Sequence, residues 1–524
     1  MKNGIRLIVL TGMTCCSVLF YGISQAGQLD PQFGMGGWVH TDLGGKEQAG
    51  TIAVQKDGKL LVGGRIALQT SAYDFLLLRY LPDGNLDTSF AGKGYKIWDF
   101  GFSQENLEFV RVLENGKILA GGFSAPNPNT SGILIQLLPD GSEDPDFGDK
   151  GFVKFKYGKS SGPVAAAIDS KGRIVVTGVC VVDSFDIDWQ VARFTQDGKP
   201  DSTFNGKGWM YHNFLTREDI PFDLMLEENG NILISGCAGV YPQANFALLS
   251  LLEDGSLNSQ FAGTGYLQTD FAGNHDIAYT ASLTADGKYL VSGTVRDTVT
   301  NYDFALARYL PDGSLDSGFG NGGKMTYDFE GPVDYGLYML KQKDNKFLVC
   351  GENNVLTKNK YVVVRYFDDG RIDSTFGENG IASFNAMSIL TDQTPHFAIA
   401  PNGKIVMAGN YRDAQNVDVL VIRWDNLVLS GIDQKSKDGR NTLRLISNPI
   451  NNEIRLEHTF SSSDGWLKLE LFDIKGVEKA HFKIPVHSSQ LVLDHPQIKQ
   501  LPTGWYFIKW NFASYSGTIP VIKK

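Results

Sequence analysis

The apolar positions of this chain fall into short runs that are separated by glycine-rich turns. In the first such unit, Gly50 to Gln55 and Lys59 to Val62 are β-prone and flank a Lys-Asp-Gly turn. A variable loop follows Gly63-Gly64, and the next apolar run, Phe75 to Leu81, ends at the turn Pro82-Asp83-Gly84. Short apolar runs bounded by Gly, Pro and Asp predict β-strands joined by tight turns.

This unit recurs along the chain, and a phenylalanine three residues after an aspartate or asparagine marks each copy. Successive markers are 57 or 58 residues apart, and they are Phe33, Phe90, Phe147, Phe204, Phe261, Phe319 and Phe376. One unit is too small to bury a core alone, so the copies must pack on one another. Four short strands per unit are typical of a propeller blade, and the copies predict a seven-bladed β-propeller. A solenoid of stacked coils is the alternative, although its repeat is usually shorter.

The two ends of the array predict how the ring closes. The first strand candidate, Gly37 to Asp42, has no preceding blade, and the last unit ends at Val417 to Trp424 with no strand after it. If the first strand completes the last blade, the exposed sheet edges disappear.

Three segments of one unit carry a family resemblance. Ala285 to Gly293, Phe304 to Gly313 and Leu315 to Gly320 resemble the bacterial delta-60 repeat, a unit that forms propellers. The resemblance extends from about Leu29 to Trp424. It implies a propeller and says little about function.

The segment from Leu443 onward differs from the repeats in charge and pattern. It holds ten Lys/Arg and seven Asp/Glu residues, whereas the rest of the chain holds 38 and 51. Alternating strands with turns at Asp473 to Gly476 and Pro502 to Gly504 predict a small all-β module.

This segment also resembles a sorting domain. Asn448-Pro449, Leu469 to Gly476 and Leu501 to Lys509 are similar to the type A sorting domain of the type IX (Por) secretion system, a small Ig-like β-sandwich. The resemblance implies that residues 443–524 bind the type IX machinery and are then cleaved off. The polar residues 430–442 read as the exposed linker where cleavage is expected.

The start of the chain predicts a signal peptide at residues 1–26, followed by the propeller at 27–429. Lys2 and Arg6 precede the apolar run Leu7 to Ile23, and Ser24-Gln25-Ala26 fits a cleavage site. A membrane anchor is the alternative, but the run is short and contains polar residues. We therefore expect Sec export through the periplasm, no transmembrane span in the mature chain, and a secreted or outer-membrane surface location.

Composition narrows the possible partners and chemistry. The net charge of −10 argues against nucleic acid as a partner. Three cysteines remain after cleavage, Cys180, Cys237 and Cys350. Their odd number and wide spacing predict buried free thiols rather than disulfides or a zinc site.

The repeat separates scaffold from recognition. Tight turns on one face of the propeller change little between units, whereas the loops on the opposite face diverge, and such loops usually carry recognition. We expect ligand binding on this variable-loop face, and the candidate residues are Asp186, Asp188, Trp189 and Tyr241.

Nine residues after each marker phenylalanine stands a position that is often acidic. The carboxylates among these positions are Asp42, Asp99, Asp270 and Asp328. They are candidates to ring the channel mouth and hold a cation such as Ca²⁺, and no other cofactor is expected. The alternative is a strand-end residue with local bonds, which Lys156 at the equivalent position favours.

An arginine and an aspartate eight residues apart recur together. They are Arg79 with Asp87, Arg193 with Asp201, Arg308 with Asp316, and Arg365 with Asp373. The unit with Ser250 has Asn258 instead, which predicts that the two positions pair across the turn. Gln136, followed by Asp144, is a partial exception.

No catalytic motif stands out. The propeller histidines, His40, His212, His275 and His396, occupy different positions in their units. We therefore expect a secreted or surface-displayed propeller that binds an extracellular glycan or protein, or serves a structural role. The alternative is an extracellular polymer-acting enzyme of the glycosidase or lyase type, with its site on the variable-loop face.

Overall fold

The computed structural model describes residues 26–426 and 443–523 with short internal gaps. The gaps are residues 69–71, 103, 126–129, 183–185, 215–216, 272–274, 297–301, 330–332, 356–357, 387–393, 413–415, 446–452, 459–465, 474–476, 487–489, 503 and 513–514. The predicted linker lies outside the described residues, as does the predicted signal segment apart from Ala26. No helix in the described part is long and apolar enough to cross a membrane.

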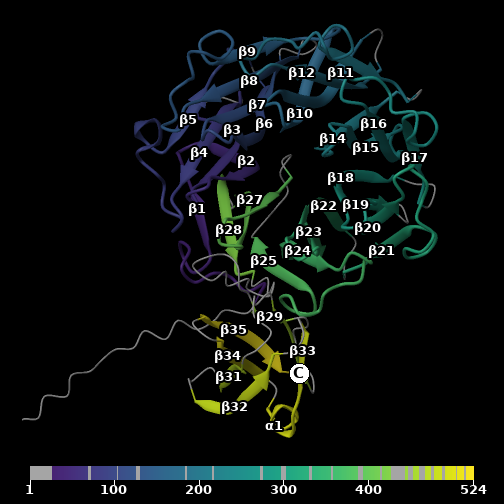
Figure 1. Cartoon of the computed structure of the whole chain (residues 1–524). Coiled ribbons are helices and arrows are strands. Elements are labelled where there is room, and N and C mark those ends of the chain that lie inside the picture. Colours follow the sequence, from purple (N-terminus) through teal and green to yellow (C-terminus); the bar gives the residue numbers. More distant parts are fainter. Residues whose placement is uncertain are drawn as a thin grey trace, which may run out of the picture.

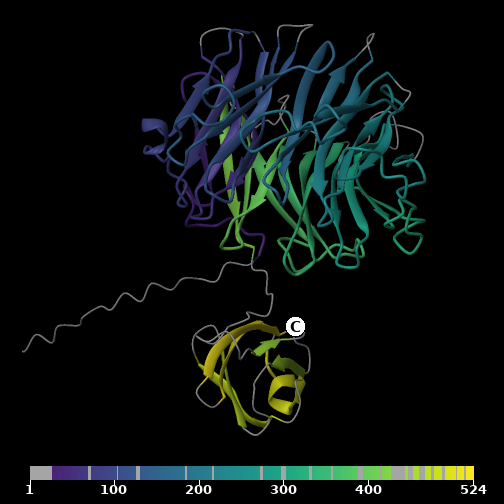
Figure 2. The same cartoon turned by 45° about the horizontal axis from the view of Figure 1, so that its top comes forward.

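Antiparallel sheets arranged in a ring make up the larger part of the molecule (Figure 1; Figure 2 shows the same ring turned by 45°). The first two sheets are β2 (Lys46–Val54), β3 (Leu60–Ala67), β4 (Asp74–Tyr80), β5 (Tyr95–Trp98), and β6 (Gln104–Val112), β7 (Ile118–Ala125), β8 (Ser131–Leu137), β9 (Phe152–Phe155). The next two are β10 (Ser160–Ile168), β11 (Ile174–Val181), β12 (Asp188–Phe194), β13 (Trp209–His212), and β14 (Asp219–Leu226), β15 (Ile232–Ala238), β16 (Asn245–Leu251), β17 (Tyr266–Thr269). These sheets are the blades of a β-propeller, so the predicted all-β class and propeller architecture are confirmed.

An eight-stranded sheet follows, in which the single parallel pair Tyr302–Val333 joins two four-stranded groups. They are β18 (Ile277–Leu283), β19 (Tyr289–Arg296), β20 (Tyr302–Tyr309), β21 (Lys324–Tyr327), and β22 (Val333–Lys341), β23 (Phe347–Val355), β24 (Lys358–Tyr366), β25 (Ile381–Ala386). The first strand of each four-stranded group contacts the first strands of its neighbours. It therefore lies innermost, and the fourth strand lies at the rim.

The last blade combines the two ends of the array. Its order is β26 (His396–Ile399), β27 (Ile405–Arg412), β28 (Val417–Trp424) and then β1 (Trp38–Thr41). Strand β1 pairs antiparallel with β28, from Trp38 opposite Ile422 to Thr41 opposite Val419. The predicted closure is confirmed, and the open solenoid is excluded because the first and last strands share a sheet.

A bulge in the innermost strand explains the glycines in the second strand. The pairing of β2 with β3 shifts register between Ala49 and Thr51. A Cβ atom on Gly64 would lie 1.9 Å from the carbonyl oxygen of Gln48, so only glycine fits there. Gly122 meets the equivalent oxygen of Asn106 in the next blade at the same distance.

The hydrophobic core lies between blades as well as within them. One buried cluster joins Val62 and Leu78 of the β2–β5 blade to Val406 and Val421 of the closing blade. The marker phenylalanines are almost fully buried throughout, as Phe33 illustrates. Each blade therefore depends on its neighbours for burial, as expected for a short repeat.

The predicted arginine–aspartate pairs all form. Nε of the arginine donates to Oδ2 of the aspartate in Arg79–Asp87 (2.8 Å), Arg193–Asp201 (2.7 Å), Arg308–Asp316 (2.8 Å) and Arg365–Asp373 (2.9 Å). In the exceptional unit, Nδ2 of Asn258 donates to Oγ of Ser250 at 3.1 Å. We call each pair a clamp, and Arg423 with Asp30 closes the ring with a further clamp at 2.6 Å.

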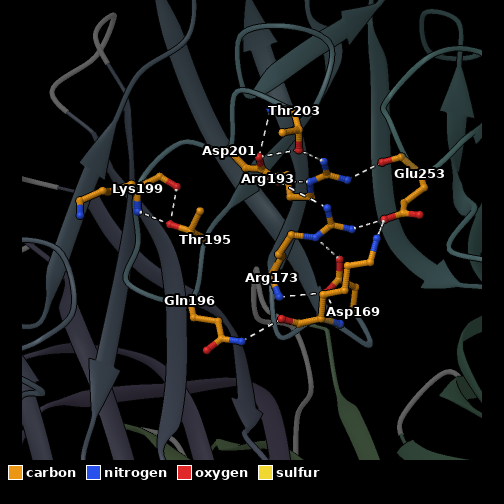
Figure 3. A network of polar contacts seen from close by, with 10 residues as sticks. Asp169, Arg173, Arg193, Thr195, Gln196, Lys199, Asp201, Thr203 and Glu253 are labelled. Carbon is orange, nitrogen blue, oxygen red and sulfur yellow. Dashed lines mark hydrogen bonds and ion pairs between the residues drawn. The ribbon is translucent and has the colours of Figure 1, made fainter.

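Each clamp also holds the marker phenylalanine and the next blade. The guanidinium of Arg193 lies 4.9 Å from the ring centroid of Phe204 and donates to the carbonyl oxygen of Glu253 in the next blade (Figure 3). Arg79 contacts Phe90 and the carbonyl oxygen of Pro139 in the same way. The recurring aspartate and phenylalanine are therefore parts of one contact that ties neighbouring blades together.

A second cation supports most clamps, and the sequence analysis did not predict it. The residue that follows the first tight turn contacts the same aspartate, as in Lys346–Asp373 (2.8 Å), Lys404–Asp30 (2.6 Å) and Lys288–Asp316 (3.1 Å). In the unit with Ser250 and Asn258 this position is Asn231. All three charges are thus absent together in that unit.

The C-terminal residues form two antiparallel sheets around one core. One sheet contains β29 (Leu443–Leu445), β30 (Glu453–His458) and β33 (Gln490–Asp494). The other contains β31 (Trp466–Asp473), β32 (Glu478–Pro485), β34 (Gly504–Phe512) and β35 (Tyr515–Lys523), and α1 (Pro496–Lys499) follows β33. Their buried cluster includes Leu456, Leu469 and Trp510 and contains only residues from Leu443 onward.

Candidate functional site

Connections on the two faces of the propeller differ in kind. The tight-turn face carries the turns after the first and third strands of each blade, including the clamps. The variable-loop face carries the connections after the second and fourth strands. Tyr241 lies on the variable-loop face in the connection between β15 and β16, and its side chain is 57% exposed.

The other predicted ligand-binding residues belong to a different blade from Tyr241, because they lie in β12 or just before it. Trp189 is fully buried and packs against Phe214, with ring centroids 4.9 Å apart. Asp188 is buried and Asp186 is half-buried. Trp189 therefore belongs to the core and offers no surface to a ligand, so of this predicted set Tyr241 presents the largest exposed surface.

Tyr241 meets an arginine and a second tyrosine from the next blade. Nη1 of Arg296, at the end of β19, donates to the hydroxyl of Tyr241 at 2.7 Å. The guanidinium of Arg296 lies 5.3 Å from the ring centroids of both Tyr241 and Tyr302. A cation held between two aromatic faces is favourably placed by the ring quadrupoles.

Two more side chains extend this group, which we call the tyrosine–arginine cluster. The ring of His275 lies 5.2 Å from that of Tyr241, and Tyr335 of β22 lies 5.1 Å from Tyr302. The cluster therefore consists of Tyr241, His275, Arg296, Tyr302 and Tyr335. It draws on three successive four-stranded groups, since its residues come from the β14–β17, β18–β21 and β22–β25 segments.

Burial and the arginine set the electrostatics of the cluster. Burial lowers the pKa of His275, and Arg296 lowers it further, so the imidazole is neutral at pH 7. Burial raises the pKa of Tyr335, and Tyr302 and Glu352 raise it further. Burial also raises the pKa of Glu352, opposite Tyr335 in β23, to about 8. Arg296 is therefore the fixed positive charge of the cluster.

The cluster could not be assembled from the sequence. Arg296 and Tyr302 stand on either side of a variable loop in one unit. An arginine and a tyrosine at these two positions were the sequence signal that this loop could take part in binding. Their approach to Tyr241 depends on how one blade is placed against the next, which sequence spacing does not specify.

The predicted cation candidates do not gather around the channel. Asp42, Asp99, Asp270 and Asp328 follow β1, β5, β17 and β21, which are rim strands. Carboxylate oxygens of Asp99 and Asp328 lie within 4.8 Å of acids from the adjoining strands, in the groups Asp74–Asp99–Glu105 and Asp303–Asp328–Asp334. The ring arrangement is thus corrected to separate acidic groups, each at the seam between two blades.

Each seam group depends on a buried acid that the sequence analysis did not single out. Such acids lie at the start of the innermost strand or just before it, and they are Glu47, Glu105, Asp219, Asp276 and Asp334. Most accept a hydrogen bond from a backbone N–H five residues earlier, as Asp276 does from Phe271 at 2.7 Å. Their spacing of 56 to 58 residues, counted with Ser161 at the position between Glu105 and Asp219, was a signal of this role.

A third polar group lies on the innermost strands of the ring. Arg111 of β6, Asp223 of β14, Tyr338 of β22 and His396 of β26 interact across the innermost strands. The rings of Tyr338 and His396 lie 3.6 Å apart. Burial raises the pKa of Asp223 to about 6 although Arg111 opposes it, and burial lowers that of His396 to about 3.

The tight-turn face has a cavity where one clamp is incomplete. It encloses about 640 Å³ and is lined by Lys117, Gln136, Asp144, Asp169 and Asp197 among others. Gln136, which lines this cavity, stands where most other units have the clamp arginine.

The remaining reactive side chains are dispersed. Cys180, Cys237 and Cys350 are buried free thiols, as predicted. Burial raises the pKa of Cys180 and Cys237 to about 12, so neither is a reactive thiolate at neutral pH.

Comparison with known proteins supports the fold. The family model described as "Domain of unknown function (DUF5122) beta-propeller" matches residues 55–90, 113–147 and 284–319. These segments contain the second and third strands, the tight turns and the marker phenylalanine of three units. No curated protein matches the chain.

The solved structures to which the chain is similar share little sequence with it. They include PorZ, a surface component of the type-IX secretion system of Porphyromonas gingivalis (10% identity, TM-score 0.40, covering 90% of this chain and 59% of PorZ). The polysaccharide lyase Uly1 has 11% identity and a TM-score of 0.40, covering 72% of this chain and 90% of Uly1. Drosophila Semaphorin 2a has 8% identity and a TM-score of 0.40, covering 93% and 97%. A likeness at this level gives no information about activity. The chain spans 59% of the length of PorZ. Together with the ring of sheets, the repeat match identifies the chain as a β-propeller protein.

Proposed function

We propose that the protein is a secreted or cell-surface binding module that recognises an acidic glycan on its variable-loop face. In this proposal the propeller has seven blades, with the eight-stranded sheet counted as two. Type IX export uses the C-terminal residues 443–524 as a cleavable Ig-like sorting domain, after a signal peptide at residues 1–26.

The tyrosine–arginine cluster is the observation that carries the binding proposal. Tyr241 exposes an aromatic face to solvent, while its hydroxyl is fixed by Arg296. A guanidinium is a bidentate donor for carboxylate or sulfate groups, and a flat tyrosine ring offers apolar surface to a sugar ring. The pairing therefore suits a polymer whose sugars carry acidic groups. Arg296, at the end of β19, holds the hydroxyl of Tyr241 in place, which lowers the entropic cost of binding.

The charge of the chain supports a local rather than a diffuse attraction. The net charge is −10, so a polyanion gains no general attraction to the protein. In this proposal, specific recognition of an acidic group then depends on a single positioned cation such as Arg296, which is 7% exposed.

Binding of defined acidic and neutral polysaccharides to the purified full-length chain tests the proposal. We expect an acidic glycan to bind and Arg296→Ala and Tyr241→Ala to weaken that binding at least about tenfold. Tyr211→Ala is the matched control, because Tyr211 is also exposed but lies on the rim strand β13. Equal affinity of all three variants, or binding of neutral glycans alone, would contradict the assignment.

An extracellular polymer-acting enzyme of the glycosidase or lyase type is the second candidate. The tyrosine hydroxyl of Tyr241, held by Arg296 beside the neutral imidazole of His275, is a combination that can move protons. The same glycans are incubated with the chain, and new reducing ends are measured. A binding module releases none, whereas release that is lost in His275→Ala would favour the enzyme.

The export proposal rests on the charge shift at Leu443 and on the sequence resemblance of the last residues. The core of residues from Leu443 onward contains no propeller residue, so the propeller should fold without it. Deletion of residues 443–524 is expected to leave a cooperatively melting propeller in the periplasm. Normal appearance of the truncated chain outside the cell would contradict the sorting role.

A further inference from the structure

The seam that closes the ring brings three carboxylates together. Asp42 follows β1, Glu47 lies in β2 and Asp418 lies in β28. One carboxylate oxygen from each residue lies within 4.8 Å of the other two. The three residues come from the first strand, the last strand and the first complete blade, so they meet only when the ring is closed.

Glu47 is the unusual member of this group. It is fully buried, and its Oε1 accepts a hydrogen bond from the backbone N–H of Gly45 at 2.9 Å. Its Oε2 is also buried and accepts no hydrogen bond from the described residues. A buried carboxylate oxygen without a donor is costly, and two neighbouring carboxylates add repulsion. Burial is the largest cause that raises the pKa of Glu47 to about 7, and Asp418 and Asp42 contribute to the rise.

We propose that Asp42, Glu47 and Asp418 bind a divalent cation of the calcium type at the closing seam. Such a cation prefers carboxylate and carbonyl oxygens and accepts irregular geometry, with roughly six to eight oxygen ligands in total. It would supply the missing partner of Glu47 Oε2 and remove the repulsion among the three carboxylates. Backbone carbonyls and water provide the remaining ligands of such sites.

Other seams show why the closing seam is the best site. The groups at two further seams, Asp74–Asp99–Glu105 and Asp303–Asp328–Asp334, have the same three positions. In the first, Glu105 accepts hydrogen bonds from the backbone N–H groups of Phe100 and Phe102. In the second, Asp334 accepts from Phe329 and from Asn353. Both carboxylate oxygens of Glu105 and of Asp334 therefore accept hydrogen bonds. Oε2 of Glu47 accepts none from the described residues.

One seam of the same propeller replaces the cluster with a built-in cation. Its three positions are Ser131, Lys156 and Ser161, and Lys156 stands where the closing seam has Asp42. All three acids are lost together at the seam that gains the lysine. Taken alone, Lys156 favoured local hydrogen bonds as the role of its position. The loss of all three acids together with the gain of a lysine is instead what a cation-binding cluster predicts.

A cation at this seam would act on closure. Asp42 and Asp418 continue the register of β1 and β28 beyond the pair Thr41–Val419, and Glu47 belongs to the neighbouring β2–β5 blade. The ion would thus join the first and last strands of the propeller to its first blade. It lies on the same face as the tyrosine–arginine cluster but in a different part of the ring, so the two proposals are independent.

Calcium titration of the purified full-length chain, freed of metal with a chelator, tests this proposal. We expect calcium chloride to bind and to raise the Tm of the propeller. Glu47→Gln keeps the shape of the side chain and removes its charge, and it should reduce the calorimetric stoichiometry by one ion per chain. Asp42→Lys copies the Lys156 seam at an exposed position, and it should also lose that ion while keeping a folded propeller.

Glu114→Gln is the matched control, because Glu114 is an exposed acid beside a tight turn. It should keep the wild-type stoichiometry and calcium-dependent Tm. If the wild-type chain neither binds calcium nor gains Tm, the proposal is wrong. It is equally wrong if both Glu47→Gln and Asp42→Lys retain the full stoichiometry. A folded Asp42→Lys variant keeps the test decisive even if Glu47→Gln fails to fold.

Discussion

On the tight-turn face the buried clamp aspartates are paired with cations, whereas on the variable-loop face buried acids such as Glu47 and Glu105 form no ion pair with the described residues. Asp373 contacts both Arg365 at 2.9 Å and Lys346 at 2.8 Å. Glu352 sits among tyrosines, and burial raises its pKa to about 8. The same repeat thus produces one face on which carboxylates are stabilised as anions and another on which burial disfavours their charge.

This difference separates a structural face from an adaptable one. A clamp that recurs in nearly every blade holds blades together, so substitution there should affect stability. The tyrosine–arginine cluster uses side chains that occur in single units, such as Tyr241 and Arg296, so substitution there should affect binding. Substitutions on the two faces should therefore separate into effects on stability and effects on binding.

Acid should remove stability through the tight-turn face. Burial raises the pKa of Asp373, but Arg365 and Lys346 outweigh it and bring the value to about 2. The unfolded chain binds this proton near pH 3.9, so the folded state carries fewer protons between these values. The stabilising contribution is complete above about pH 4 and is lost as the pH falls through about 2. Urea unfolding from pH 5 to pH 2 measures this loss, which several clamps share.

Glu352 should give the opposite dependence on the other face. Its raised pKa means that the folded state binds a proton more tightly than the unfolded chain does. The contribution is favourable below about pH 4.5 and is lost as the pH rises through about 8. Glu352→Gln should flatten the unfolding profile on this alkaline side and leave the acid side unchanged. An unchanged alkaline profile in this variant would contradict the contrast between the faces.

Removing one clamp arginine is the next largest effect. Arg365→Ala leaves the fully buried carboxylate of Asp373 with Lys346 as its remaining cation. Breaking a buried ion pair in this way typically costs about 3–5 kcal/mol. Chemical denaturation of the variant measures the loss. The proposed glycan binding should be unaffected, because Arg365 lies on the tight-turn face.

The unit with Ser250 and Asn258 shows how an arginine–aspartate clamp can be replaced by an uncharged pair with a smaller loss of stability. Arg308→Ser combined with Asp316→Asn reproduces the pair Ser250–Asn258, which keeps a hydrogen bond without charge. We expect the double variant to lose about 1–2 kcal/mol, less than Arg308→Ala alone. Arg308→Ala leaves the charged carboxylate of Asp316 with Lys288 as its remaining cation, whereas the double variant removes that carboxylate charge as well. A double variant less stable than Arg308→Ala would show that charge itself is required at the clamp.

More contacts of the tight-turn face than of the variable-loop face could be predicted from the sequence. The reason is that repeated units can be compared with one another, so positions that change together reveal a contact. The coordinated change to Ser250 and Asn258 predicted the clamps, and the unpaired end strands predicted the closure of β1 onto β28. The second clamp cation and the buried seam acids such as Glu47 also recur in the sequence. Their recurrence alone does not show which residues they contact. They could have been found by comparing units.

The variable-loop face could not be predicted to the same depth. Trp189 was expected to contact a ligand, yet it is buried in the core, because aromatic residues near a loop also fill the space between strands. Arg296 and Tyr302 join Tyr241 from a different blade, and this approach depends on the packing of blades rather than on any spacing in the chain. Only the face itself was indicated by loop divergence.

The smallest expected effect on stability is at Tyr241. Its ring is 57% exposed, so Tyr241→Ala removes little buried surface and should change the free energy of unfolding by about 0.5 kcal/mol or less. Trp189→Ala is the informative comparison, since loss of a fully buried aromatic side chain typically costs about 3–5 kcal/mol. Denaturation and glycan binding are measured on both variants. Tyr241→Ala should lose binding with normal stability, and Trp189→Ala should lose stability first. If Tyr241→Ala unfolds the chain, the exposed ring supports the scaffold, and the division between the two faces fails at its most exposed residue.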